Sequence, residues 1–217
     1  MQTLRLGDFL TRRDGADLTF THIFSSDLRR AAHTARAIFE AQSAYGQREY
    51  GSSFQVAAGV VQLSDLQEVN FGSREGLTYN PNLHFKDDRE TFESMVSRAD
   101  RFINVHLLPV LQALPPPPSG VNPAIAIVSH GIFLSVLWRQ LMQSRPAHYV
   151  PSTRLTNTGF ISLIVPPTKG GTRISDWPLQ VRDINVTTHL SGLKRAPDAS
   201  AEFDGKQRKI ESYFPAI

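Results

Sequence analysis

AIAIVSHGIFLSVLWRQLMQ, residues 124–143, joins an unbroken apolar run to an amphipathic segment through a polar triplet. The run 124–128 is typical of a buried parallel strand, and residues 132–142 predict a helix. Ser129, His130 and Gly131 would then lie at the carboxyl end of the strand, where open α/β sheets bind ligands. The free N–H groups of the helix start favour an anion, and a histidine there can act as a base, a nucleophile or a phosphate contact. Alternatively, Ser129 merely caps the helix and His130 is half-buried.

A second transition from strand to helix, again through a polar triplet, lies earlier in the sequence. Residues 18–24, LTFTHIF, predict a strand, Ser25, Ser26 and Asp27 follow, and residues 28–40 predict a helix. Arg29 and Arg30 fall in the first turn of that helix, where positive charge is unfavourable unless an anion lies nearby. The alternative is that both arginines are simply solvated on the helix surface.

The remaining patterns complete an α/β fold. Residues 1–12 predict a helix, residues 41–52 a polar loop, and residues 54–63 a second apolar strand. A long helical pattern covers residues 89–114 and ends at the prolines that begin with Pro115. Residues 160–165 and 179–186 predict an antiparallel pair at the edge of the sheet, joined by a hairpin turn at residues 169–172. We therefore expect a mostly parallel central sheet flanked by helices.

Composition limits the classes of function. The chain has 217 residues, 41% of them hydrophobic, which suits one globular domain, and its lack of cysteine excludes a disulfide scaffold. The net charge of +3 is small and the basic residues are scattered, so nucleic-acid binding is not expected. The chain start carries no signal pattern and no apolar stretch suits a bilayer, which predicts an intracellular protein, cytoplasmic or nuclear, without membrane contact. The seven histidines lack ligand spacing, so neither a metal nor another cofactor is expected.

Four segments together resemble the histidine phosphatase superfamily, the phosphoglycerate mutase-like proteins. They are SSDLRRAAHTA at 25–35, LQEVNFGSREG at 66–76, IVSHG at 127–131 and NTGF at 157–160. Each segment alone is a weak signal, but the set and its order are specific. The resemblance implies a three-layer α/β sandwich and hydrolysis of a phosphate monoester, in a small molecule or a phosphoprotein, through a phosphohistidine.

The resemblance also implies roles for four residues. Arg30 matches the phosphate-binding arginine of the family, with Ser26 and Thr34 among the residues that fill out its motif. Glu68 matches the general acid that protonates the leaving oxygen, although it lies in a segment where it could equally be a surface residue of a local turn. His130 matches the second histidine, a catalytic residue that contacts the phosphoryl group, and Asn157 resembles a polar residue flanking the phosphate site.

One family feature is missing from the sequence. The family begins with a strand ending in Arg-His-Gly, whose histidine is phosphorylated, and no such triplet occurs in these 217 residues. His22 is the nearest histidine, but it precedes the end of its strand and is a poor substitute. The expected fold therefore lacks the first strand of the family, and the chain is expected to be inactive as written. Three explanations stay open: a truncated sequence, a non-catalytic relative, or a substitute nucleophile.

The last residues predict a second function. Residues 1–187 make up the predicted domain, and residues 188–217 a polar, disordered tail. Within it, QRKIESYF at 207–214 resembles the PCNA-interacting box, which implies that Ile210, Tyr213 and Phe214 enter an apolar site of the clamp while Gln207 makes polar contacts. The chain would then be a non-catalytic binding module that docks on the sliding clamp. Alternatively, the apolar residues of the tail pack back onto the domain. The sequence leaves the oligomeric state open.

Overall fold

The structure is a computed structural model that describes residues 1–11, 18–50, 57–76, 88–114, 122–144, 155–166 and 170–193. The helices are α1 (Gln2–Thr11), α2 (Arg29–Tyr50), α3 (Phe92–Phe102), α4 (Leu108–Ala113) and α5 (Gly131–Leu141). The strands are β1 (Leu18–Ser26), β2 (Val60–Leu63), β3 (Asn122–Val128), β4 (Phe160–Ile164) and β5 (Gln180–Val186). Short 3₁₀ turns cover Ser64–Leu66, Gly72–Arg74, Ile174–Asp176 and Thr188–Leu190, and a π-helical turn covers Ile103–Leu107.

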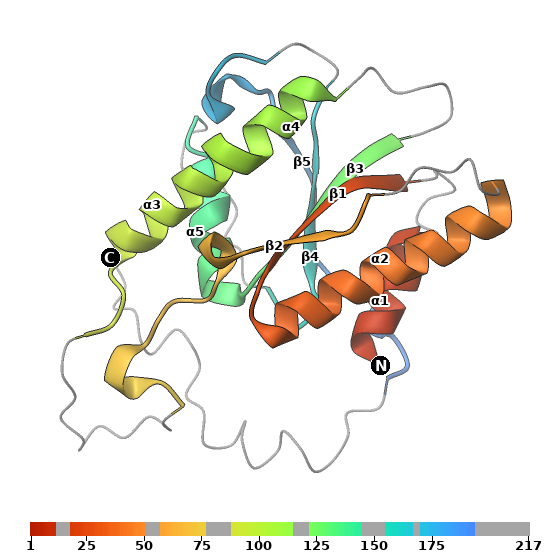
Figure 1. Ribbon diagram of the computed structural model, residues 1–217, viewed down its shortest axis with the longest axis horizontal. Coiled ribbons are helices and arrows are strands. Elements are labelled where there is room, and N and C mark those ends of the chain that lie inside the picture. Colours follow the sequence, from red (N-terminus) through yellow and green to blue (C-terminus); the bar gives the residue numbers. More distant parts are fainter. Residues whose placement is uncertain are drawn as a thin grey trace. The chain divides into compact units, whose positions relative to one another are not determined.

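The chain divides into two units, Met1–Glu68 with Phe92–Ser191, and Val69–Thr91 with Gly192–Ile217. In the second unit, Asp88 accepts hydrogen bonds from the backbone N–H and the hydroxyl of Ser73 at 2.9 and 3.0 Å. There the guanidinium of Arg89 also lies 5.2 Å from the ring centroid of Phe71. The first unit holds every helix and strand labelled in Figure 1.

The sheet of the first unit is parallel, as the sequence predicts. β1 lies between β2 and β3, with Phe24 opposite Val61 on one side and Ile127 on the other. Since all three strands run in the same direction, the ends of β1 and β3 meet at one edge, with Ser25 opposite Val128. The residues that follow each strand therefore start side by side.

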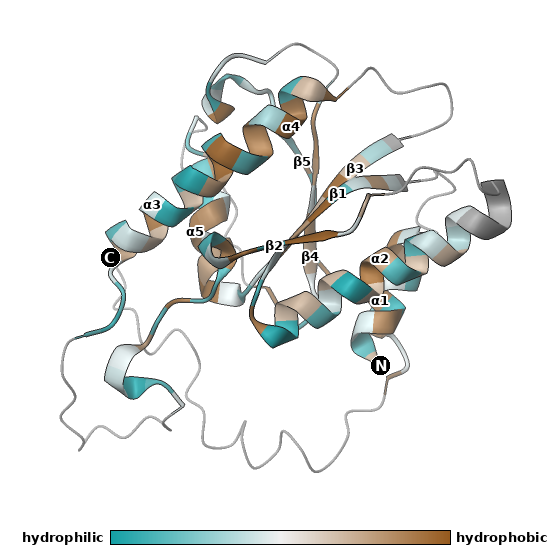
Figure 2. Ribbon diagram, in the orientation of Figure 1, coloured by the Kyte–Doolittle hydropathy of each residue, from teal (hydrophilic) through white to brown (hydrophobic). Residues whose placement is uncertain are grey.

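Helices cover both faces of this sheet (Figure 1). Alternate residues of a strand point to opposite faces, and in β1 Ile23 packs in a core cluster with Leu6 of α1 and Ile38 of α2. The next residue, Phe24, makes an edge-to-face contact with Phe102 of α3, with ring centroids 5.5 Å apart. Figure 2 shows the matching hydropathy, with apolar strands between helices that are apolar on one side only. The architecture is the predicted α/β fold.

Helix α1 approaches α2 closely because Gly7 lies at their contact. A Cβ atom at this position would lie 2.7 Å from the carbonyl oxygen of Ala37, so only glycine allows this spacing. The helix predicted at residues 1–12 is thus confirmed at Gln2–Thr11, packed against α2 and the sheet.

The antiparallel pair is also confirmed, but not as an edge of the parallel sheet. β4 pairs with β5 in a two-stranded sheet of their own, with Phe160 opposite Val186. Within the described residues no strand joins β3 to β4, because β3 pairs there with β1 alone. The predicted hairpin turn lies partly outside the described residues, and Ile174–Asp176 forms a 3₁₀ turn after it.

Helix α2 corrects the prediction of a loop at residues 41–52. The helix continues to Tyr50, since the buried side chain of Gln42 accepts a hydrogen bond from the Phe20 N–H at 2.9 Å. Gln42 is 1% exposed, so this polar residue faces the sheet rather than ending the helix. The predicted strand 54–63 is likewise shorter, because only Val60–Leu63 is strand and residues 51–56 lie outside the described chain.

The long helical pattern at 89–114 is interrupted by one π-helical turn. Pro109 has no N–H to donate to the carbonyl of Val105, and the π turn Ile103–Leu107 lies directly before it. The rest of the pattern is helical, from Phe92 to Ala113.

The ordered chain also extends beyond the domain boundary expected at residue 187. His189 is buried, and its ring centroid lies 5.8 Å from that of Phe9 and 6.3 Å from that of Phe160. These aromatic contacts hold the 3₁₀ turn Thr188–Leu190 against α1, so the first residues of the expected tail belong to the domain. Residues 194–217 lie outside the described chain. No helix among the described residues has the length and apolarity needed to span a bilayer.

Candidate functional site

Two helix starts lie together at the carboxyl edge of the parallel sheet. Ser26 ends β1 and α2 begins at Arg29, while Val128 ends β3 and α5 begins at Gly131. His130 joins the two junctions, because its Nε2 lies 3.0 Å from the hydroxyl oxygen of Ser26. The two junctions are thus in direct contact, and their joint role as a site stays a prediction.

His130 is held in a fixed orientation. It is 8% exposed and occupies the N-cap position of α5. The hydroxyl oxygen of Ser26 already accepts the Leu28 N–H at 3.1 Å, so the hydroxyl proton of Ser26 is available to His130 Nε2. The alternative in which His130 is only half-buried is wrong, because the ring lies in the buried contact between the two strand ends.

The charge state of His130 depends on the groups around it. Burial lowers the pKa of His130 below its ordinary value of 6.5, and the positive charge of Arg30 lowers it further. The negative charges of Glu68 and Asp27 act in the opposite direction. The imidazole is therefore neutral at pH 7, with one guanidinium and two carboxylates within electrostatic reach.

Glu68 caps helix α5. Its carboxylate oxygens accept hydrogen bonds from the backbone N–H groups of Ile132 at 3.3 Å and Phe133 at 3.0 Å. Negative charge is favourable at this end of a helix. The alternative in which Ser129 caps the helix is wrong, since its hydroxyl instead donates to the carbonyl oxygen of Leu66 at 2.6 Å. Glu68 is not a residue of a merely local surface turn either, because its partners lie 64 and 65 positions away.

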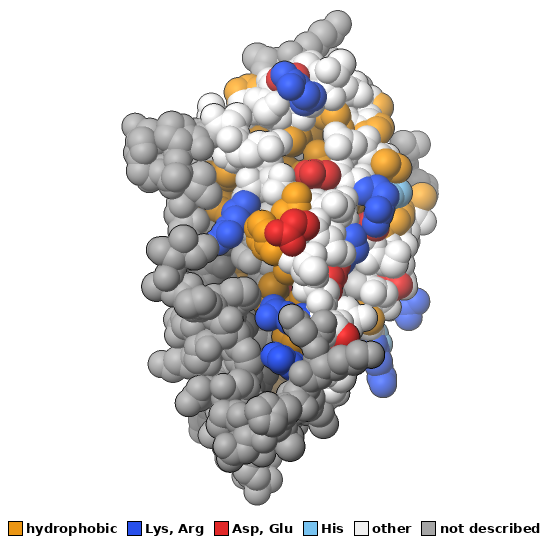
Figure 3. Space-filling model, turned by 90° about the vertical axis from the view of Figure 1, so that its left-hand side faces the viewer, with side chains coloured by type: hydrophobic (Ala, Val, Ile, Leu, Met, Phe, Trp, Pro, Cys, Tyr) orange, Lys and Arg blue, Asp and Glu red, His pale blue; other side chains and the backbone are white. Residues whose placement is uncertain are grey.

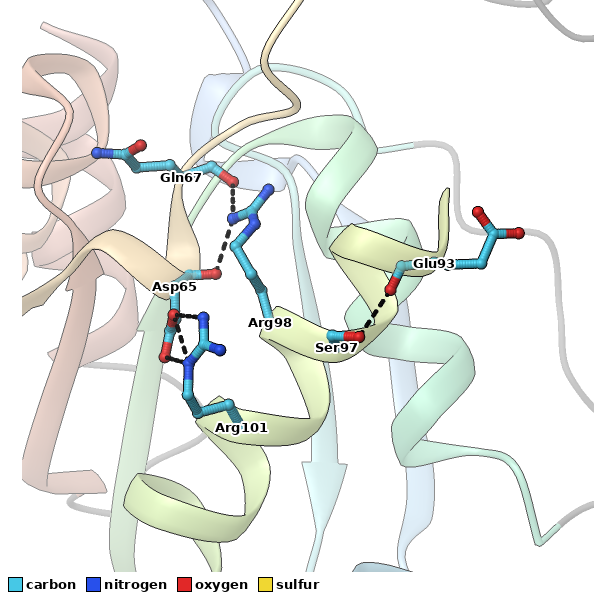
Figure 4. Close-up of polar contacts among 6 residues, drawn as sticks. All are labelled: Asp65, Gln67, Glu93, Ser97, Arg98 and Arg101. Atoms are coloured by element: carbon cyan, nitrogen blue, oxygen red, sulfur yellow. Dashed lines mark hydrogen bonds and ion pairs between the residues drawn. The ribbon is translucent and has the colours of Figure 1, made fainter. Parts of the chain in front are cut away.

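The segment before Glu68 is held from two directions. Figure 4 shows Arg98 of α3 donating to the carbonyl oxygens of Asp65 and Gln67, both at 2.9 Å, and Arg101 bound to the Asp65 carboxylate. The side-chain amide of Gln67 donates to Asp27 at 2.8 Å, which links this segment to the junction between β1 and α2. No local sequence pattern predicts these partners, because the residues of each pair are more than thirty positions apart.

Arg30 is exposed in the first turn of α2, and its backbone carbonyl accepts a hydrogen bond from Thr34. The residues Arg30, Ser26, Glu68 and His130 are called the anion cluster below. Ser26 is fully buried and Glu68 is half-buried, so the exposed guanidinium of Arg30 is the member most open to solvent.

The other predicted site residues lie elsewhere. The side-chain amide of the exposed Asn157 donates to the Oε1 atom of Gln2 at the start of α1, at 2.6 Å. Its role beside a phosphate stays a prediction. The four residues of the predicted clamp-binding box, Gln207, Ile210, Tyr213 and Phe214, lie outside the described chain.

The described residues and one face of the molecule bear on the sequence predictions for metal ligands and surface charge. Within the described ranges, no three histidine, aspartate or glutamate side chains are grouped so as to hold a metal ion. On the face seen in Figure 3, the described basic and acidic side chains are mixed, with apolar side chains between them. This mixture agrees with the scattered charges of the sequence.

Comparisons with known proteins bear on the fold and the family of the chain. No curated protein sequence matches the chain. A mycobacterial glucosyl-3-phosphoglycerate phosphatase, solved with inorganic phosphate, superposes with a TM-score of 0.61 at 18% identity over 88% of this chain and 86% of its own. A phosphoglycerate mutase from Bacillus anthracis str. Sterne gives a TM-score of 0.53 at 17% identity, over 87% of this chain and 80% of its own.

YhfR from Bacillus stearothermophilus gives a TM-score of 0.53 at 16% identity, over 87% of this chain and 83% of its own. At these identities the three structures establish the fold alone. The family assignment comes from the sequence, because residues 4–179 match the family model described as histidine phosphatase superfamily (branch 1). This chain belongs to the histidine phosphatase superfamily.

Proposed function

We propose that this chain binds phosphate monoesters at the anion cluster. Arg30 and His130 would contact the phosphoryl oxygens, and Glu68 would lie beside the leaving oxygen. The observation that carries the proposal is the contact between His130 Nε2 and Ser26 Oγ, because it fixes the two helix starts against each other. Binding would place the negative charge of the phosphoryl group next to an exposed guanidinium, in a site where the imidazole can take up a proton.

Hydrolysis is proposed only for a form of the protein that contains the family histidine that becomes phosphorylated during the reaction. In that reaction the histidine nitrogen would bond to phosphorus, the ester P–O bond would break, and Glu68, after taking up a proton from solvent, would give that proton to the leaving oxygen. Water would then cleave the phosphohistidine. The Arg-His-Gly triplet is absent from these residues, so we expect the chain as written to bind without turnover.

The edge of β3 that faces away from β1 supports the proposal that an additional strand pairs there in the complete family fold. A parallel strand in the middle of a sheet is normally buried on both faces. Yet Ala124, Ile125, Ile127 and Val128 of β3 are only half-buried, and within the described residues this strand pairs on one side only. We propose that the family strand would pair along this edge of β3.

The test is calorimetric titration of the full chain with orthovanadate and with inorganic phosphate. The mycobacterial phosphatase that shares this fold has been solved in complex with VO3 and with inorganic phosphate. We expect saturable binding of one ion per chain and no release of p-nitrophenol from p-nitrophenyl phosphate. Absence of binding by either ion would remove the proposal. Release of p-nitrophenol would contradict the expectation that the chain binds without turnover, because hydrolysis requires a nucleophile within this sequence.

A second candidate function rests on the sequence QRKIESYF at residues 207–214. Here the chain would be a non-catalytic phosphatase-fold module that docks on the sliding clamp PCNA through Gln207, Ile210, Tyr213 and Phe214. A nuclear location would follow from this function, whereas phosphate-monoester binding alone would also suit the cytoplasm. Titration of the full chain onto purified clamp tests it, with a Tyr213→Ala/Phe214→Ala variant as control. Equal binding by the two chains, or no binding, would contradict the clamp hypothesis.

A further inference from the structure

We propose that Arg98 of α3 is a positioning residue for Glu68, an inference that rests on the proposed function of the anion cluster. Arg98 Nη1 donates to the backbone carbonyl oxygens of Asp65 and Gln67, at 2.9 Å in each case (Figure 4). Residues 67–71, which include Glu68, belong to no helix or strand. The backbone beside Glu68 is therefore held by single contacts, namely the hydrogen bond from the Gln67 N–H to the Ser64 carbonyl at 3.0 Å and side-chain donors from elsewhere in the chain.

These contacts satisfy three successive carbonyl groups. Arg98 binds those of Asp65 and Gln67, and Ser129 donates to the carbonyl of Leu66 between them at 2.6 Å. Leu66 itself is fully buried, so the packing of its side chain also holds this segment in place. Since buried carbonyl groups need partners, removal of Arg98 would leave two of the three without their donor.

Arg98 also contacts Phe133, one of the two residues that bind the Glu68 carboxylate. Its guanidinium carbon lies 4.6 Å from the ring centroid of Phe133, a cation–π distance. Phe133 is fully buried and its N–H is one of the two donors to the Glu68 carboxylate. One guanidinium thus touches both the segment that carries the carboxylate and the residue that binds it.

Arg101 provides the matched control on the same helix. It binds the side chain of Asp65 rather than a backbone carbonyl, and 54% of its side chain is exposed. Because this pair joins two side chains, its loss leaves the backbone carbonyl groups of Asp65 and Gln67 with their donor, Arg98. Loss of Arg101 should therefore leave the position of Glu68 unchanged, whereas loss of Arg98 should release it from the start of α5.

The first experiment measures amide hydrogen exchange of the full chain at Ile132 and Phe133, the two donors to Glu68. We expect exchange about tenfold faster in Arg98→Met and in Glu68→Ala than in the wild type, the effect of losing a hydrogen bond to a charged acceptor. In Arg101→Met the two rates should stay at wild-type values. Wild-type exchange in Arg98→Met would overturn the inference.

The second experiment separates positioning from simple packing. Glu68 raises the pKa of His130, whereas Arg30 lowers it and Asp27 raises it from the junction of β1 and α2. An NMR titration of the His130 ring should therefore show a lower pKa in Arg98→Met and no change in Arg101→Met. Adding Arg98→Met to Glu68→Ala should change neither readout further, because the first residue acts through the second. An unshifted titration in Arg98→Met would also overturn the inference.

Both readouts are independent of ligand binding. If the wild type binds no vanadate, the proposed function fails, while the exchange rates and the titration still decide whether Arg98 positions Glu68. Should Arg98→Met not fold, Arg98→Lys replaces it, because lysine keeps the charge but not the planar, longer guanidinium. We then expect an increase of about threefold in exchange at the two amides. Wild-type rates in Arg98→Lys would contradict the assignment.

Discussion

The two helix starts at the carboxyl edge of the sheet differ in how their positive ends are neutralised. At α5 the protein supplies its own anion, since the Glu68 carboxylate accepts the N–H groups of Ile132 and Phe133. The first turn of α2 carries no acidic residue and instead bears Arg29 and Arg30, both exposed. Positive side chains thus add to the positive end of the helix dipole. This difference supports the proposed binding of an external anion at α2 rather than at α5.

Ser26, which ends β1, and Ser129, which follows β3, also differ in the groups that they bind. Ser26 contacts His130 and thereby connects its junction to the ionisable groups of the anion cluster. Ser129 binds only a backbone carbonyl, that of Leu66, so its role is to fix the segment before Glu68. We therefore expect Ser26 to act mainly on the ligand-binding groups and Ser129 mainly on stability, with His130 in contact with both junctions.

The largest effect is expected from removing the charge at α2. Arg30→Ala should weaken vanadate and phosphate binding at least thirtyfold, because a charge-assisted hydrogen bond contributes about 2–3 kcal/mol. The matched control is Arg36→Ala, an exposed arginine further along the same helix, which should leave the affinity within about threefold because exposed charges beyond the first turn interact weakly with a bound anion. Calorimetric titration of the three chains checks this. Equal losses in both variants would mean that α2 acts through its overall charge and not through a site at its start.

The next effect concerns the pH dependence of folding. Burial lowers the pKa of His130 in the folded chain, so between that pKa and 6.5 the unfolded chain binds more protons. The contribution of His130 to the free energy of unfolding should thus be complete above about pH 6.5, and it should decrease as the pH falls below this value. The slope for one proton cannot exceed about 1.4 kcal/mol per pH unit.

Urea denaturation at a series of pH values measures this slope, and His130→Gln should reduce it. Burial also lowers the pKa of His189, which therefore contributes with the same sign. His189→Gln is the comparison, because it lies outside the anion cluster and should reduce the slope without affecting vanadate binding. A slope unchanged in His130→Gln would contradict the buried, neutral state of that imidazole.

At α5, loss of the cap should reduce stability. Glu68→Ala removes the acceptor of two backbone N–H groups, and loss of a helix N-cap typically costs about 1 kcal/mol. For a chain of this size, that corresponds to a decrease of about 2–4 °C in the midpoint of thermal unfolding. Glu68→Gln should lose less, because the amide oxygen can still accept one of these bonds. A Glu68→Ala chain as stable as the wild type would mean that the α5 start does not depend on this carboxylate.

The sequence predicted the elements of both junctions better than their contacts. The alternation of apolar and polar runs was enough to place β1, β3 and the starts of α2 and α5, because these elements follow from local periodicity. The cap of α5 was not predictable in the same way, since Ser129 is a good local candidate and Glu68 lies 64 positions earlier than Ile132. Contacts at such separations depend on the packing of the sheet.

Two further residues show why local composition failed. Gln42 is polar and favoured a loop, yet it is buried in α2 because its side chain meets the otherwise unpaired N–H of Phe20. Arg98 belongs to a helix that the pattern predicted, but nothing in that pattern indicates that its guanidinium reaches the carbonyls before Glu68. In both cases a long polar side chain satisfies a distant backbone group.

The smallest effect should come from the serine at the α5 junction, and it gives the sharpest test of the comparison. Ser129→Ala leaves the Leu66 carbonyl without its side-chain donor, which should lower the free energy of unfolding by about 0.5–1.5 kcal/mol. The ring ¹⁵N signals of His130 should stay unchanged, because Ser129 binds the backbone of another segment. Ser26→Ala removes the hydroxyl that contacts Nε2, so there the ring signals should move even if stability is little affected. Ring signals that move equally in both variants would show that the two junctions respond as one unit, and the division between a ligand-binding and a stabilising junction would be wrong.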